Sequence, residues 1–239
     1  MAILIQLTHI MADPSKLKYR IDPDEPFSGP HQTGHVATSG AELPEAGAAM
    51  ILVHGRGASA ESILTLADDF DEPDIHYAAP QASQFTWYPY SFLEPTDRNQ
   101  PGLNSGLQVI YDLMTAIEKA GIPKEKIILA GFSQGACLAS EFAARHPARY
   151  GGVVALSGGL IGDSISPESY TGDLEETPVF LGCSDSDPHI PVERVHQTEE
   201  VFNSLNGNVT KKIYPGMPHT VIRDEIEHVK KTIINAVRS

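Results

Sequence analysis

The chain of 239 residues is long enough for one α/β domain with a full hydrophobic core, and we expect residues 1–239 to form a single domain. A formal net charge of −14 disfavours partners that need a basic patch, so we expect neither nucleic acid nor an anionic membrane surface to bind. Hydrophobic residues make up 41% and charged residues 20%, values that argue against a disordered chain.

The sequence shows no sign of a targeting peptide, a membrane span or a metal site. Residues 1–10 carry no basic region and no long apolar core. The two cysteines, Cys137 and Cys183, belong to no metal-ligand spacing, and we expect both to be buried free thiols. These features favour a cytoplasmic protein, monomeric or homodimeric, that needs neither a metal nor an organic cofactor.

The first third of the chain alternates between strand-like and helix-like segments. Residues 1–47 are the least regular part, and their place relative to the sheet stays open. Apolar runs and helical periodicity predict strands at 2–7, 35–38, 48–53 and 75–79 and a helix at 59–70. An acidic cluster follows that helix, and we expect it to be a solvated surface and not a metal site: Asp68, Asp69, Asp71, Glu72 and Asp74.

A long irregular segment, residues 81–104, interrupts this alternation. Loops of such length are usually functional or disordered, and the aromatic residues here favour function. We expect these aromatic side chains to be either walls of a substrate pocket or part of the core: Trp87, Tyr88, Tyr90 and Phe92.

The remaining segments continue the alternation to the end of the chain. The pattern predicts helices at 106–120, 134–145, 192–205 and 219–237, and strands at 127–130, 152–156, 179–183 and 209–214. Strands that alternate with helices predict a mostly parallel sheet with helices on both faces, hence the α/β class. In such sheets the active site lies at the carboxyl ends of the strands.

The segment Gly131-Phe-Ser133-Gln-Gly135 matches the G-x-S-x-G nucleophile elbow. The bare pattern occurs by chance in about one chain in ten of this length. Here, however, an apolar strand precedes it and an alanine-rich helix follows it, which is the context that the elbow requires. The turn strains the backbone of Ser133, and the flanking glycines allow the strand and the helix to approach closely. Ser133 is therefore the predicted nucleophile.

A serine nucleophile needs a base, and the base needs an orienting carboxylate, in the chain order Ser, Asp or Glu, His. His219 is the candidate base because it lies in a Pro/Gly-rich loop directly after a predicted strand. Asp187 is preferred over Asp185 as the orienter because Pro188 fixes the chain beyond it. Other histidines after Ser133 are expected on helices (His146 and His196), on the exposed side of the last helix (His228), and in a pocket wall or on the surface (His189).

Two backbone amides are predicted to form an oxyanion hole. The first is that of Gln134, directly after the nucleophile, and the second is that of Arg56, in the glycine-containing loop after strand 48–53. We expect His54 to be a structural hydrogen-bonding residue. The Arg56 side chain is either an exposed charge or a contact for an acidic substrate.

With these residues in place, the chain resembles the phospholipase/carboxylesterase family of α/β-hydrolases, over residues 48–237. The similar segments are 51–57, 121–123, 127–136, 155–159, 185–191 and 216–219. The resemblance implies an α/β-hydrolase fold, with Ser133 as nucleophile, Asp187 as orienter and His219 as base. It also implies that the amides of Arg56 and Gln134 form the oxyanion hole.

The resemblance implies a serine hydrolase that forms an acyl-enzyme intermediate. Arg56, where the family often carries Leu, and the segments 85–90 and 99–103 favour a carboxylesterase for small carboxylic esters. An acyl thioesterase or lysophospholipase with the same residues is the alternative, and a non-catalytic binding protein of the same fold is a further one. No amphipathic lid helix is evident in 81–105, which disfavours a lipid-interface enzyme.

Overall fold

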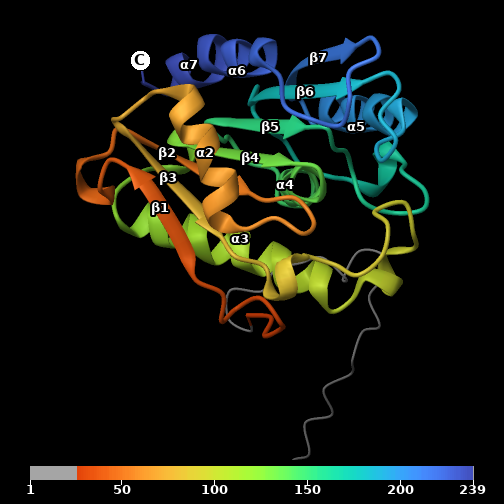
Figure 1. Ribbon diagram of the computed structural model, residues 1–239, viewed down its shortest axis with the longest axis horizontal. Coiled ribbons are helices and arrows are strands. Elements are labelled where there is room, and N and C mark those ends of the chain that lie inside the picture. Colours follow the sequence, from red (N-terminus) through yellow and green to blue (C-terminus); the bar gives the residue numbers. More distant parts are fainter. Residues whose placement is uncertain (1–25, 239) are drawn as a thin grey trace, which may run out of the picture.

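The computed structural model describes residues 26–238, whose centre is a seven-stranded sheet (Figure 1). The strands lie in the order β1-β3-β2-β4-β5-β6-β7, and all neighbours are parallel except β1 and β3. Their bounds are Val36–Gly40 (β1), Ala48–Val53 (β2), Ile75–Pro80 (β3), Ile127–Phe132 (β4), Gly152–Leu156 (β5), Pro178–Ser184 (β6) and Asn208–Tyr214 (β7). This is the mostly parallel sheet that the sequence predicts.

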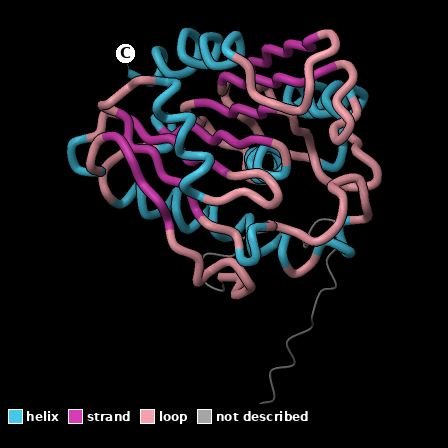
Figure 2. The backbone as a smooth tube through the Cα atoms, viewed as in Figure 1, coloured by secondary structure: helices cyan, strands magenta, loops and turns pink. Residues whose placement is uncertain are grey.

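Helices cover both faces of the sheet (Figures 1 and 2). The helices are α2 (Ala60–Phe70), α3 (Gly102–Lys119), α4 (Gln134–Arg145), α5 (Val192–Ser204), α6 (Arg223–Val229) and α7 (Asn235–Arg238). A π-helical turn, Lys230–Ile234, joins α6 to α7, and short 3-10 turns lie at Leu43–Glu45, Ser83–Phe85, Thr96–Asn99, Lys124–Lys126 and Pro167–Ser169. Side chains of α2, α6 and α7 share one core layer with the sheet, while those of α3, α4 and α5 share the other.

The central strands are fully covered by these helices. All six residues of β2 have no exposed surface, and the burial of β4 ends only at Phe132. Burial on both faces explains why these strands are continuous apolar runs and not alternating patterns. The loops that follow the parallel strands consequently lie together at the carboxyl ends of the strands, where a site can form.

Two predicted helices begin four residues away from their observed starts, at 106 and 219 in place of 102 and 223. Helix α3 begins at Gly102 and not at residue 106, because Leu103 and Ser105 are buried although the local Gly, Asn and Ser residues are weak helix formers. The segment predicted as the helix 219–237 becomes helical only at Arg223, where α6 begins, so His219 lies in the loop before it. The predicted strand 2–7 lies outside the described residues, whereas the strand expected at 35–38 is β1.

The acidic cluster is only partly a solvated surface. Glu72 is 9% exposed, forms an ion pair with Arg238, and lies 3.4 Å from Lys230. Asp74 also pairs with Arg238, at 2.9 Å. These contacts fasten the C-terminal helices to the connection between α2 and β3, which the local sequence does not indicate.

Two further expectations can be compared with the structure. His228 is half-buried, with its ring centroid 4.7 Å from that of Phe180, so the expectation of an exposed side chain was wrong. Both cysteines are buried free thiols, as expected. Among residues 26–238 no helix is long and apolar enough to cross a membrane, and no group of three or more His, Cys, Asp or Glu side chains is placed to hold a metal ion.

Candidate active site

The elbow between β4 and α4 has the strained geometry that its sequence predicts. Ser133 has φ 55° and ψ −121°, a backbone conformation that is costly for a residue with a side chain. A Cβ on Gly135 would lie 1.9 Å from the carbonyl oxygen of Val53, and one on Gly131 would lie 2.4 Å from the backbone of Gly135. Glycine is therefore required on both sides of the serine by close backbone approach.

The Ser133 hydroxyl lies at one end of a chain of hydrogen bonds. Its Oγ is 2.9 Å from Nε2 of His219, and Nδ1 of His219 is 2.7 Å from Oδ2 of Asp187. The other oxygen of Asp187 accepts the amides of His189 and Ile190, at 2.8 and 3.0 Å. With Nδ1 donating to the carboxylate, Nε2 is free to accept the serine proton. The three predicted residues are thus brought together.

The carboxylate of Asp187 is held in its ionised form. Its side chain has no exposed surface, and burial alone would raise its pKa. The hydrogen bonds from His219 and from two backbone amides outweigh burial and lower the pKa of Asp187 below its ordinary value. A fixed negative charge beside an imidazole stabilises its protonated form.

Asp185, the competing carboxylate, has a different partner. Its Oδ1 accepts the amide of Gly216 at 2.8 Å, on the loop that carries His219. Asp185 therefore contacts the loop that carries His219, whereas Asp187 contacts the imidazole of His219 itself. The ring of His219 is further enclosed by Phe132 and His189, each with a centroid distance of 4.8 Å.

The two amides expected to form an oxyanion hole belong to residues that line the same cavity as Ser133. Arg56 follows β2, which pairs with β4, and Gln134 is the first residue of α4. Within residues 26–238, neither amide donates to another group of the protein. The N-terminus of a helix leaves an amide such as that of Gln134 free to receive a developing negative charge.

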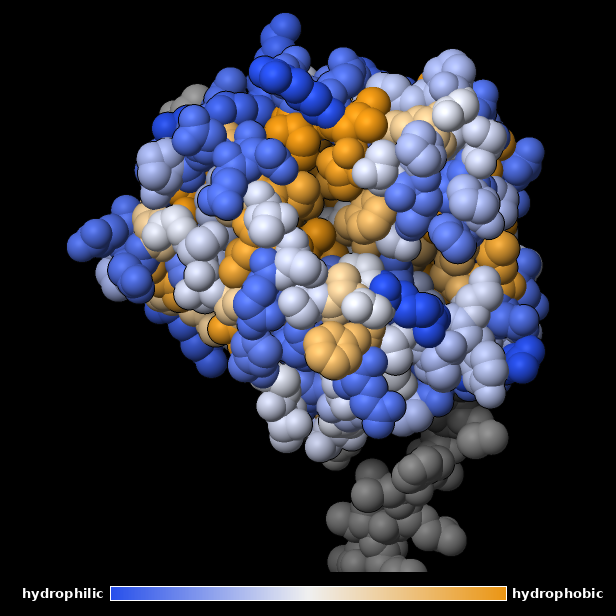
Figure 3. All heavy atoms as spheres, in the orientation of Figure 1, coloured by the Kyte–Doolittle hydropathy of each residue, from blue (hydrophilic) through white to orange (hydrophobic). Residues whose placement is uncertain are grey.

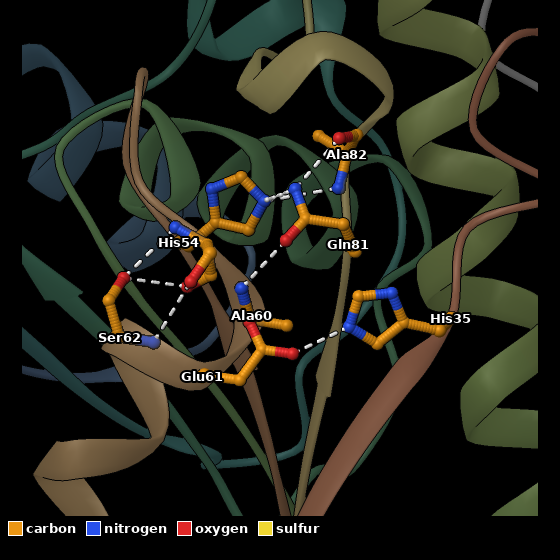
Figure 4. A network of polar contacts seen from close by, with 8 residues as sticks. His35, His54, Ala60, Glu61, Ser62, Gln81 and Ala82 are labelled. Atoms are coloured by element: carbon orange, nitrogen blue, oxygen red, sulfur yellow. Dashed lines mark hydrogen bonds and ion pairs between the residues drawn. The ribbon is translucent and has the colours of Figure 1, made fainter.

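His54 is a structural residue, in agreement with expectation. It has no exposed surface, its Nδ1 lies 2.8 Å from the carbonyl oxygen of Gly55, and its Nε2 accepts the amide of Ala82 at 3.1 Å. Figure 4 shows this ring beside Gln81, whose side chain accepts the amide of Ala60 at 2.9 Å. Burial lowers the pKa of His54 and keeps the imidazole neutral. The ring thus joins the oxyanion loop to the start of the aromatic segment.

A cavity of about 640 Å³ opens beside Ser133. Tyr88, Tyr90, Phe92 and His189, all expected as pocket residues, line it together with both oxyanion residues. Trp87 is not among the lining residues: it is fully buried, and its indole donates to the carbonyl oxygen of His54 at 2.9 Å. Trp87 is therefore a core residue.

The cavity also has walls that the sequence analysis missed: Phe132, Cys137 and Ile190. For Phe132 and Ile190 a signal was available, because they lie close to Ser133 and Asp187 in the chain. Cys137 is buried against Tyr88, and burial raises the pKa of its thiol to about 12, so it is not a reactive nucleophile.

A second depression, a groove of about 660 Å³ between α2 and α6, shares two residues with the cavity, Phe132 and His219. Figure 3 shows hydrophobic side chains gathered around a hollow on this face of the molecule. Phe132 and His219 thus form the partition between the two depressions. Ser133 lines the cavity and not the groove.

Residues 38–236 match the family described as phospholipase/carboxylesterase. The chain belongs to this family. Acyl-protein thioesterase 1 of Saccharomyces cerevisiae is 29% identical over 172 residues, which are 70% of this chain and 76% of that protein. The protein of the same name from Candida albicans is 28% identical over 214 residues, or 80% of this chain and 92% of the relative.

Solved structures agree with this placement. A phospholipase/carboxylesterase from Dyadobacter fermentans is 42% identical, with a TM-score of 0.82 over 84% of this chain and 97% of the other. A Bacillus cereus carboxylesterase shares the fold at 16% identity, with a TM-score of 0.69 over 86% of this chain and 95% of the other. The α/β-hydrolase fold and the serine hydrolase class, comprising esterases and thioesterases, are therefore confirmed.

Proposed function

We propose that this protein is a carboxylesterase that hydrolyses small carboxylic esters through an acyl-enzyme at Ser133. The observation that carries the proposal is the chain of hydrogen bonds from Ser133 through His219 to Asp187, beside an aromatic-lined cavity. Apolar walls with a few convergent polar groups are typical of small-molecule sites. Membership of an esterase and thioesterase family supports the same reaction class.

In the first step His219 accepts the Ser133 proton as Oγ attacks the ester carbonyl. Asp187 keeps the proton of Nδ1 in place and stabilises the imidazolium. The amides of Arg56 and Gln134 donate to the oxyanion of the tetrahedral intermediate, and each such donor contributes about 3–4 kcal/mol to the transition state. His219 then gives its proton to the departing alcohol, and the acyl group stays on Ser133.

Water completes the cycle. His219 takes a proton from a water molecule, whose oxygen attacks the acyl carbon, and the same amides receive the second oxyanion. When that intermediate collapses, His219 returns the proton to Ser133 and the carboxylic acid leaves. The proposed cycle uses only residues of this chain and water.

Thioester hydrolysis is the second candidate, because the curated relatives reported above are acyl-protein thioesterases. The same residues would perform it. Arg56 in the oxyanion loop and the aromatic segment 85–90 support the choice of small esters. Comparison of kcat/KM for an oxygen ester and a thioester with the same acyl group separates the two candidates.

Hydrolysis of p-nitrophenyl esters from acetate to palmitate tests the proposal. We expect activity that is greatest for short acyl chains and that falls by about 10⁶ in kcat in Ser133→Ala. Wild-type Ser133 should also react covalently with a fluorophosphonate. A long-chain optimum would shift the assignment towards lipid or acyl-protein substrates. Absence of both turnover and labelling would overturn the catalytic assignment and favour a binding protein.

A further inference from the structure

We propose that Arg56 is a positioning residue for the acyl group: its side chain holds residues 86–90 as a wall of the substrate cavity, in a fixed relation to the oxyanion hole. The inference rests on the proposed function and extends it from the reacting bond to the selection of the acyl chain. It also gives a role to a side chain that the sequence analysis left open between an exposed charge and a substrate contact.

The guanidinium of Arg56 meets acceptors on four of these five residues. Its Nη1 donates to Oγ1 of Thr86 and to the carbonyl oxygen of Pro89, both at 3.0 Å. Its Nη2 donates to the carbonyl oxygens of Tyr88 and Tyr90, at 2.9 and 2.7 Å. A planar guanidinium with several fixed N–H directions suits such a ring of acceptors, which an ammonium could satisfy only in part.

Gln134, the other expected oxyanion residue, also forms side-chain hydrogen bonds to the same segment. Its Oε1 accepts the amide of Trp87 at 2.9 Å and the hydroxyl of Thr86 at 3.2 Å, and its Nε2 donates to the carbonyl oxygen of Tyr88 at 2.9 Å. The carbonyl of Tyr88 therefore receives donors from both residues. The two residues whose backbone amides are proposed to bind the oxyanion thus hold one cavity wall with their side chains.

Residues 86–90 need these contacts because they contain no helix or strand, and the short turn Ser83–Phe85 ends directly before them. Trp87 and Tyr88 are buried whereas Tyr90 is 49% exposed, so burial holds the middle of the segment and not its outer end. The residue directly before the segment is anchored independently, since the amide of Gly57 donates to the carbonyl oxygen of Phe85 at 2.7 Å. Loss of the Arg56 side chain should therefore loosen residues 86–90 and leave the rest of the fold in place.

The contacts also define what Arg56 does not do. Each terminal nitrogen already donates to two acceptors of the protein, so a substrate carboxylate could bind to these two nitrogens only by displacing the segment. Arg56 is thus better suited to shape the wall against which an uncharged acyl chain packs. Tyr88 and Tyr90 present that wall to the cavity.

The substitution Arg56→Met tests this role, since it keeps the backbone amide and the length of the side chain but removes every side-chain donor. We expect the ratio of kcat/KM for p-nitrophenyl butyrate to that for the acetate to fall about five-fold, mainly through KM, because the longer chain uses more of the wall. Arg56→Lys should recover part of the ratio.

Arg149→Met is the matched control. Arg149 also donates to a backbone carbonyl, that of Glu175 at 2.9 Å. However, it lies just before β5, at the amino ends of the parallel strands, whereas Arg56 follows β2 at their carboxyl ends. We expect this variant to keep the butyrate-to-acetate ratio within two-fold of the wild type. An equal fall in both variants, or an unchanged ratio in Arg56→Met, would contradict the inference.

Hydrogen–deuterium exchange measures directly how firmly Arg56 holds the segment, and it needs no substrate turnover. In Arg56→Met we expect the amides of the four non-proline residues, Thr86, Trp87, Tyr88 and Tyr90, to exchange at least ten-fold faster, with other segments unchanged, whereas Arg149→Met should show no change there. Unchanged exchange in Arg56→Met would overturn the inference even if the ester ratio moved. Fluorophosphonate labelling of the wild type, measured alongside, tests the proposed function separately.

Discussion

Ser133, Asp187 and His219 lie within hydrogen-bond reach because each occupies a loop at the carboxyl end of a parallel strand, β4, β6 or β7. At the scale of single residues, the site depends on which atom contacts which. Asp185 and Asp187 are two residues apart and chemically identical. One accepts a backbone amide of the base loop and the other accepts the imidazole.

This difference yields a prediction for a matched pair of variants. Asp187→Asn should lower kcat by about 10⁴, because an amide cannot supply the charge and disfavours the required tautomer of His219. Asp185→Asn should change kcat by less than about five-fold, since its side-chain oxygen can still accept the amide of Gly216. Steady-state kinetics on p-nitrophenyl acetate measures both. Similar losses of kcat in the two variants would show that the observed hydrogen bonds do not determine which aspartate orients His219.

At the scale of the elements, the elbow depends on backbone contact between β2, β4 and α4. Gly135 has no room for a side chain, since the carbonyl oxygen of Val53 occupies that position. The pattern of glycines around Ser133 identified the elbow from the sequence alone, because a strained turn requires those residue types locally. The start of α3 could not be predicted in the same way, because burial of Leu103 and Ser105 against distant segments decides it.

Replacement of glycine by alanine should therefore change the free energy of unfolding very differently at two positions. Gly135→Ala should lower the free energy of unfolding by about 3 kcal/mol or more, because a backbone carbonyl cannot move aside cheaply. Gly47→Ala is the control: a Cβ at this position meets nothing within 4 Å, and we expect a change within about 0.5 kcal/mol. Urea unfolding followed by circular dichroism measures both. A tolerated Gly135→Ala would contradict the close approach.

At the scale of the whole molecule, the C-terminal helices complete the fold by packing over one face of the sheet (Figure 1). Glu225 of α6 is fully buried in this layer. Its Oε2 accepts the amide of Ile222 at 2.9 Å, while its Oε1 has no hydrogen-bond partner among the described residues. Burial, reinforced by Asp224 and opposed by Lys212 and the Ile222 amide, raises the pKa of Glu225 to about 7.

This buried acid predicts a pH-dependent stability. Because the pKa is higher in the folded state than its ordinary value near 4.5, the folded protein binds the proton more tightly. The stability due to Glu225 is therefore greatest below about pH 4.5, falls as the pH rises to about 7, and is constant above that. Above pH 7, the ionised form of Glu225 therefore lowers the free energy of unfolding by about 3 kcal/mol relative to the protonated form.

Glu225→Gln should remove this dependence and keep an acceptor for Ile222. We expect the variant to be more stable than the wild type by about 2–3 kcal/mol at pH 8 and by less than about 1 kcal/mol at pH 5. Urea unfolding at the two pH values measures the difference. The same difference at both pH values would mean that the effect comes from packing and not from ionisation.

The sequence alone determined the alternation of strands and helices, the elbow at Ser133 and the loop that supplies His219, because these features depend on periodicity and on the local demands of turns. Tertiary structure decided the partner of each aspartate, the burial of Trp87 and of Glu72, and the acceptors of the Arg56 guanidinium. These features depend on distances between loops far apart in the chain, and such distances are set only when the sheet and its two helical layers pack together.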